Sequence, residues 1–171
     1  YAQRAAATPG TLLITEGTII SARAGNQHNV PGIYTPEQIG AWKSIVNEVH
    51  NAGSFVYLQL WALGRTAEPD VLTRETGIPL KSSSAIPMEE SGAVPEALSE
   101  EEILELITDY GRAASAAVHQ AGFDGVEIHA ANVRYRDNLL PIKSDFNSRD
   151  ISSTSSPKIL ATRATTNGVA V

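Results

Sequence analysis

Residues 35–60 have the sequence TPEQIGAWKSIVNEVHNAGSFVYLQL, which predicts a helix followed directly by a strand. Residues 35–38 have the pattern of a capping box, with proline at the first helical position. Apolar residues then recur every three or four positions, and Gly53 follows as a helix stop: Ile39, Trp42, Ile45, Val46 and Val49. The apolar run from Phe55 to Leu60 is short and follows a glycine, so it predicts a buried strand.

The same alternation continues on both sides of this stretch. Leu12-Leu13-Ile14, closed by Glu16-Gly17, predicts an earlier strand. Residues 99–122 contain a second capping box, an apolar stripe and a final glycine, and residues 126–128 predict a third strand. Strands that alternate with helices of this length indicate an α/β fold with a parallel sheet and right-handed crossovers. Residues 62–98 predict a long excursion, a kind of loop that is usually functional.

The composition fits one compact domain with a small-molecule partner. The chain has 171 residues, 42% of them hydrophobic and 19% charged. The absence of cysteine excludes a disulfide framework and a thiolate metal site, and the net charge of -6 argues against nucleic-acid binding. The sequence has no apolar run near the roughly 18 residues of a membrane span and no signal-like N-terminal segment. We therefore expect a cytoplasmic protein.

The charge distribution divides the chain in two. Residues 1–132 carry 7 basic and 16 acidic side chains, a balance of -9, whereas residues 133–171 carry 6 basic and 3 acidic ones, a balance of +3. The second segment holds ten Ser and Thr residues and no sustained hydrophobic period. We interpret residues 1–132 as a folded domain and residues 133–171 as an aberrant, irregular tail.

Polar residues follow the predicted strands at the ends where α/β proteins place their chemistry. His129 and Asn132 are three residues apart, so both can donate hydrogen bonds to one carbonyl oxygen. Gln59 is an amide in an apolar strand, and its donor and acceptor suit a flavin or pyrimidine edge. Gly17 allows a flat ligand to approach the backbone closely.

Each of these residues also has a purely structural interpretation. His129 can cap the strand, Asn132 can form a turn, and Gln59 can bond to neighbouring backbone. Gly17 can be an ordinary turn glycine. The four histidines are scattered without carboxylates at ligand spacing, so we predict no metal site. Residues 82–84 are three serines without the surroundings of a hydrolase nucleophile.

Several linked motifs resemble the Old Yellow Enzyme family: YAQR at 1–4, PGTLLITEG at 9–17, QLW at 59–61 with Gly64-Arg65, and GFDGVEIH at 122–129 with Asn132. The resemblance implies about three βα units of a TIM (β/α)8 barrel that holds FMN. In that family NADPH reduces the flavin, which delivers hydride to the alkene of an enone or enal. Residues 64–90 further resemble the fungal ergot-alkaloid branch, whose substrate is chanoclavine-I aldehyde.

Carried over by position, the resemblance implies a flavin and substrate site. Gln59 would bond the pyrimidine edge of FMN, Gly17 would lie against the isoalloxazine, and His129 with Asn132 would hold the substrate carbonyl oxygen. The family's proton-donor tyrosine is replaced by Arg134, and a guanidinium is not a usable acid near neutral pH. The family's first strand and its phosphate-binding arginines and glycines lie outside the matching motifs. The resemblance therefore implies that this chain is an inactive fragment of such an enzyme, with no catalytic residue. The alternative is a non-catalytic remnant that binds flavin or a protein partner.

The genetic code suggests how residues 133–171 arose. Reading residues 149–171 one base out of frame permits Gly-Tyr-Leu-Ile-Asp-Gln-Phe and Glu-Trp-Gly-Gly-Ser, which resemble family motifs. Val133-Arg134 can be encoded by an intron-donor sequence. Our hypothesis is that residues 133–148 are translated intron and residues 149–171 a frameshifted exon. Sequencing the transcript tests this, and a locus with no restored downstream frame would contradict it.

Overall fold

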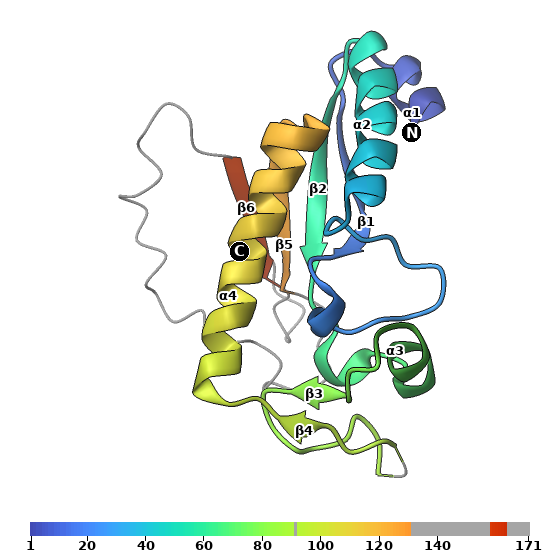
Figure 1. Cartoon of the computed structure of the whole chain (residues 1–171). Coiled ribbons are helices and arrows are strands. Elements are labelled where there is room, and N and C mark those ends of the chain that lie inside the picture. The colour runs from blue at the N-terminus through green and yellow to red at the C-terminus, as the bar shows by residue number, and fades with distance from the viewer. Residues whose placement is uncertain (91, 131–157, 164–171) are drawn as a thin grey trace.

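A four-stranded parallel sheet forms the centre of the computed structural model, which describes residues 1–90, 92–130 and 158–163 (Figure 1). The strand order is β1-β2-β5-β6. The strands are β1 (Leu12–Ile19), β2 (Phe55–Trp61), β5 (Gly125–Ala130) and β6 (Lys158–Arg163). The parallel α/β arrangement predicted from the alternation of strands and helices is confirmed.

β1 is longer than the sequence predicted. It continues past Glu16-Gly17 to Ile19, so Gly17 lies inside the strand rather than at its end. The register with β2 shifts between Ile14 and Gly17, which pair with Tyr57 and Gln59. A glycine inside a strand often marks an irregularity or a close approach of another group, and Gly17 lies at the register shift with the Trp61 indole close to it.

Two short helical segments flank β1: α1 (Ala2–Ala7) precedes it and the 3₁₀ helix η1 (Ala22–Ala24) follows it. A longer helix, α2 (Pro36–Asn51), comes next in the chain. The predicted capping box of α2 is present: the Gln38 N–H donates to the Thr35 hydroxyl at 3.3 Å, and the Thr35 N–H donates to Gln38 Oε1 at 3.0 Å. The Trp42 indole N–H donates to the carbonyl of Gly32, which fixes this core residue.

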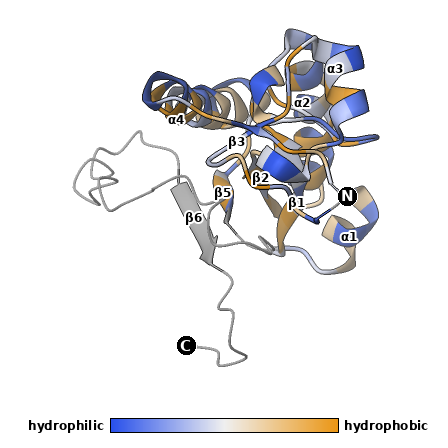
Figure 2. Cartoon of the chain, turned by 90° about the horizontal axis from the view of Figure 1, so that it is seen from below, coloured by the Kyte–Doolittle hydropathy of each residue, from blue (hydrophilic) through white to orange (hydrophobic). Residues whose placement is uncertain are grey.

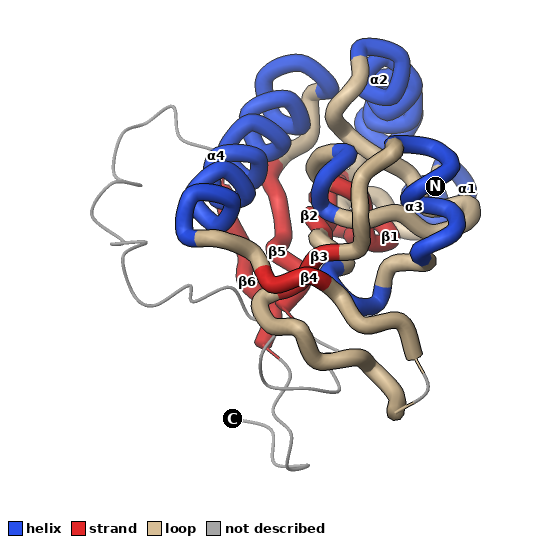
Figure 3. Tube along the Cα trace, turned by 60° about the horizontal axis from the view of Figure 1, so that its bottom comes forward, coloured by secondary structure: helices blue, strands red, loops and turns tan. Residues whose placement is uncertain are grey.

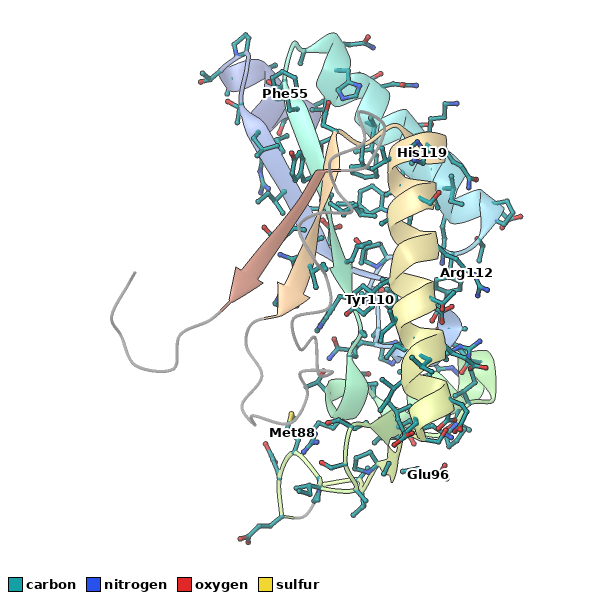
Figure 4. All side chains as sticks on the ribbon, turned by 90° about the vertical axis from the view of Figure 1, so that its left-hand side faces the viewer. Phe55, Met88, Glu96, Tyr110, Arg112 and His119 are labelled. Carbon is teal, nitrogen blue, oxygen red and sulfur yellow. The ribbon has the colours of Figure 1, made fainter. Side chains whose placement is uncertain are left out.

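α4 (Glu100–Ser115) begins at the second predicted capping box and continues into a π-helical segment, η3 (Ala116–Ala121). Gly122 ends it in the left-handed conformation, with φ of 88°. Burial raises the pKa of Tyr110 to about 12, and Figure 4 shows this side chain directed from α4 toward the sheet. On the apolar stripe of this helix Leu106 is buried, whereas Ile107 is 40% exposed. No helix in the described part of the chain is long and apolar enough to cross a membrane.

The core lies between one face of the sheet and the helices α2 and α4–η3, which lie together on that side (Figure 2). Its largest fully buried members include Val46, Val49, Val56, Leu58, Leu60, Phe123 and Val126. Because side chains alternate along a strand, the residues between them point to the opposite face. There Leu12, Ile14 and Phe55 are 46%, 41% and 51% exposed. The described residues therefore leave apolar surface of the sheet uncovered.

The excursion predicted over residues 62–98 is partly ordered into short elements. These are the 3₁₀ helix η2 (Gly64–Thr66), α3 (Pro69–Thr76), and the paired strands β3 (Lys81–Ser82) and β4 (Glu96–Ala97). They gather at the end of the sheet where β1 and β2 terminate (Figures 1 and 3). The Lys81 ammonium lies 2.5 Å from a Glu102 carboxylate oxygen, which joins the excursion to α4.

The segment expected to be irregular contains the strand β6. Its residues Lys158–Arg163 pair in parallel with Gly125–Ala130 of β5. The expectation of an irregular tail is therefore wrong for these six residues. The physical reason is that β5 would otherwise present a row of unpaired backbone groups, which an extended segment can satisfy. The boundary at residue 132 stays a prediction.

Candidate ligand-binding site at the strand ends

The sheet register places three polar or small residues in one row. Gly17 pairs with Gln59, and Gln59 pairs with Glu127. Since directly paired residues of neighbouring strands point to the same face, the row lies on the face away from α2 and α4. Trp61 and His129 lie two residues further along their strands on this same face. The structure thus brings together three of the predicted site residues, Gly17, Gln59 and His129.

Glu127 belongs to this site and was not predicted as a functional residue. The residue is only 3% exposed, and its Oε1 atom accepts a hydrogen bond from Gln59 Nε2 at 2.5 Å. The backbone N–H of Gln59 donates to the Thr15 hydroxyl at 2.9 Å. A usable signal was present in the sequence: an acidic residue between Val126 and Ile128, two positions before His129 and therefore on its face of the strand.

A flat group already covers Gly17. A Cβ atom at this position would lie 2.6 Å from Cε3 of Trp61, so the indole packs directly on the glycine. A flavin ring at Gly17 would require the indole to move aside. The placement of Gly17 against an isoalloxazine stays a prediction, whereas the Gln59 amide offers the donor and acceptor that a pyrimidine edge needs.

His129 lies beside the same indole. The Trp61 and His129 rings are 5.4 Å apart at 71°, an edge-to-face contact. Burial lowers the pKa of His129 below its ordinary value of 6.5, and the opposing effect of the Glu127 charge is smaller. Near neutral pH the imidazole is therefore uncharged, with one N–H to donate. Asn132 and Arg134 lie outside the described residues, so the pairing of His129 with Asn132 stays a prediction.

The lowered pKa of His129 makes stability depend on pH in a definite direction. As the pH falls below about 6.5, the unfolded chain binds a proton at this residue before the folded chain does, so the folded state loses stability. We expect the free energy of unfolding to decrease more between about pH 7.5 and pH 5.5 for the native chain than for His129→Gln. Denaturant unfolding at both pH values measures this. An equal decrease in the two proteins would contradict the assignment.

The site combines an amide, a buried carboxylate, an imidazole and an indole at the end of a parallel sheet. In the part of the chain that the structure describes, no three His, Asp or Glu side chains are grouped to hold a metal ion. Amide and imidazole groups at this end of a parallel sheet lie where α/β proteins bind small organic ligands. Residues 1–139 match the NADH:flavin oxidoreductase / NADH oxidase family, and the chain belongs to that family.

Several relatives at the sequence level are fungal proteins. The chain is 58% identical over 132 residues to a chanoclavine-I aldehyde reductase of Penicillium roqueforti, covering 77% of this chain and 35% of that protein. It is 52% identical over 140 residues to a probable inactive dehydrogenase of Claviceps purpurea, covering 82% of this chain and 36% of that protein. The chain thus spans about a third of the length of the curated relatives it matches.

The solved structures that resemble this chain point to the same family as the sequence relatives. An Old Yellow Enzyme from Pichia sp. AKU4542 superposes with a TM-score of 0.67 at 42% identity, covering 75% of this chain and 35% of that one. Morphinone reductase superposes with a TM-score of 0.64 at 34% identity, covering 71% of this chain and 36% of that one. The predicted resemblance to the Old Yellow Enzyme family of FMN flavoproteins, with its TIM-barrel fold, is confirmed.

Proposed function

We propose that this chain is the part of an ene-reductase barrel that binds the pyrimidine edge of FMN and the carbonyl of an enone or enal. It would supply about three βα units of the eightfold barrel. The observation that carries the proposal is the placement of Gln59, Glu127 and His129 on one face of the sheet at its carboxyl end. The similarity of the chain to a chanoclavine-I aldehyde reductase suggests an alkaloid aldehyde as the substrate.

The chain's own residues would bind and polarise rather than complete the reaction. Bound FMN, reduced by NADPH, supplies the hydride in this family. Gln59 would accept a hydrogen bond from the flavin's imide N–H. The uncharged His129 imidazole would donate to the substrate carbonyl oxygen, together with Asn132, and so draw electron density from the conjugated alkene.

We further propose that the chain does not complete alkene reduction. Arg134 stands where the family has its proton-donor tyrosine, and a guanidinium stays protonated near neutral pH. The relative from Claviceps purpurea, which is named a probable inactive dehydrogenase, is consistent with loss of activity in this group. The chain would then bind the reactants but lack the group that donates a proton to the α-carbon of the alkene.

A flavin titration tests the binding proposal. Adding the purified chain to FMN should change the flavin fluorescence saturably, and Gln59→Leu should weaken binding about tenfold or more because an amide–imide hydrogen bond is lost. Gln120→Leu is the matched control, because Gln120 is exposed on η3, away from the site. Incubation with NADPH and an enal should give no reduced product. A native chain that leaves FMN fluorescence unchanged would overturn the proposal.

The uncovered face of the sheet supports a second candidate function, the binding of a protein partner. Leu12, Ile14 and Phe55 expose apolar surface, and β1 is one of the two edge strands of the described sheet. Exposed strand edges and apolar patches favour association with another polypeptide. Light scattering of the purified chain tests this function. A colourless native chain that self-associates, together with a Phe55→Ser variant that self-associates less, would support partner binding over flavin binding.

A further inference from the structure

The hydrogen bond between Gln59 and Glu127 determines which end of the amide a ligand meets. Gln59 Nε2 lies 2.5 Å from Glu127 Oε1, and the two residues are directly paired across β2 and β5. An ionised carboxylate only accepts hydrogen bonds, so the NH₂ end of the amide has to face it. Oε1 of Gln59 then points away from Glu127. We infer that Glu127 is a positioning residue that fixes this orientation and makes the site select ligands carrying an N–H donor.

The surroundings of the pair hold it in this arrangement. The Glu127 carboxyl group is buried, and a buried carboxylate that lost its donor would carry a large desolvation penalty. The Gln59 backbone is fixed on its other side by the hydrogen bond to Thr15. Turning the Gln59 amide over would set its carbonyl oxygen against the carboxylate, which is repulsive. Without Glu127, the two amide orientations would differ little in energy.

The chemical class of ligand follows from this orientation. Oε1 can accept from the N–H of a cyclic imide, and the second N–H of the amide can donate to a carbonyl next to it. A flavin has this imide, so the inference deepens the proposed function and rests on it. An imide alkylated at nitrogen has no donor and places a methyl group against Oε1. The site should therefore distinguish FMN from 3-methyl-FMN.

Two measurements test the role of Glu127, and the first needs no flavin. The side-chain NH₂ signals of Gln59, identified by their loss in Gln59→Leu, should show protection from solvent exchange by NMR in the native chain. In Glu127→Gln the partner can donate as well as accept, so this protection should fall. Glu127→Asp keeps an acceptor-only partner and should retain part of it. Unchanged Gln59 signals in Glu127→Gln would overturn the inference.

The second measurement compares the two flavins. The native chain should bind FMN about tenfold or more tightly than 3-methyl-FMN, and Glu127→Gln should reduce that ratio to about threefold or less. A merely structural role for Glu127 would weaken both flavins equally, and that result would also overturn the inference. If the native chain binds neither flavin, the proposed function fails, while the NMR measurement still decides the role of Glu127.

Discussion

Phe123→Ala is expected to lower the free energy of unfolding by about 3–5 kcal/mol, the usual range for removing a buried aromatic ring. Phe123 is 2% exposed and meets the Trp42 ring edge-to-face at 5.6 Å. It follows Gly122 directly, so it joins the end of η3 to the sheet and α2. A loss of this size is a large fraction of the roughly 5–15 kcal/mol that stabilises an ordinary domain.

Phe55→Ala is the matched control for this prediction. Phe55 is the same residue type and begins β2, but it is 51% exposed on the uncovered face of the sheet (Figure 4). Its removal should change the free energy of unfolding by about 0.5 kcal/mol or less. Urea unfolding followed by circular dichroism measures both variants, and Trp42 fluorescence reports on the core beside Phe123. Equal losses for the two phenylalanines would contradict the assigned core.

Helix starts could be predicted from the sequence because they depend on neighbouring residues. Thr35 with Gln38, and Ser99 with Glu102, each form the reciprocal hydrogen bonds that their spacing indicates. Both partners of such a pair lie within one helical turn, so no tertiary contact has to be known. α3 was missed for a related reason: it is only one part of a proline-rich excursion and has no capping side chain at Glu68.

The strand boundaries and the partner of Gln59 depend on contacts between distant residues. Gly17 was interpreted as the end of a strand, but β1 continues because β2 pairs with it as far as Ile19. Glu127 is 68 positions from Gln59, and only the register of β2 with β5 brings the two together. Local patterns predicted Gln59 and His129 individually but missed Glu127. They did not show which of them form hydrogen bonds with each other.

Gly17→Ala is expected to destabilise the fold by about 1–3 kcal/mol through overpacking. The new Cβ atom would lie 2.6 Å from Cε3 of Trp61, closer than real contacts allow, and 3.0 Å from Cδ2, which is also tight. The indole has to turn away, and because it lies beside His129, the ligand face changes as well. Urea unfolding measures the loss, and a shift in the emission of Trp61 should accompany it.

The cause can be tested by removing the indole. In a Trp61→Leu background the added methyl group has room, so Gly17→Ala should lower the free energy of unfolding by about 0.5 kcal/mol or less. The coupling energy between the two substitutions should then be nearly as large as the effect of Gly17→Ala alone. Gly40→Ala is the matched control: apart from its chain neighbours and the backbone of α2 itself, no atom lies within 4 Å of its Cβ position. Alanine should stabilise this helix by about 0.5–1 kcal/mol. An unchanged cost of Gly17→Ala without the indole would show that the glycine is required by the backbone. A loss of stability that disappears without the indole would show that Trp61 is the reason why position 17 needs glycine. The sequence had instead suggested that this glycine leaves space for a flat ligand.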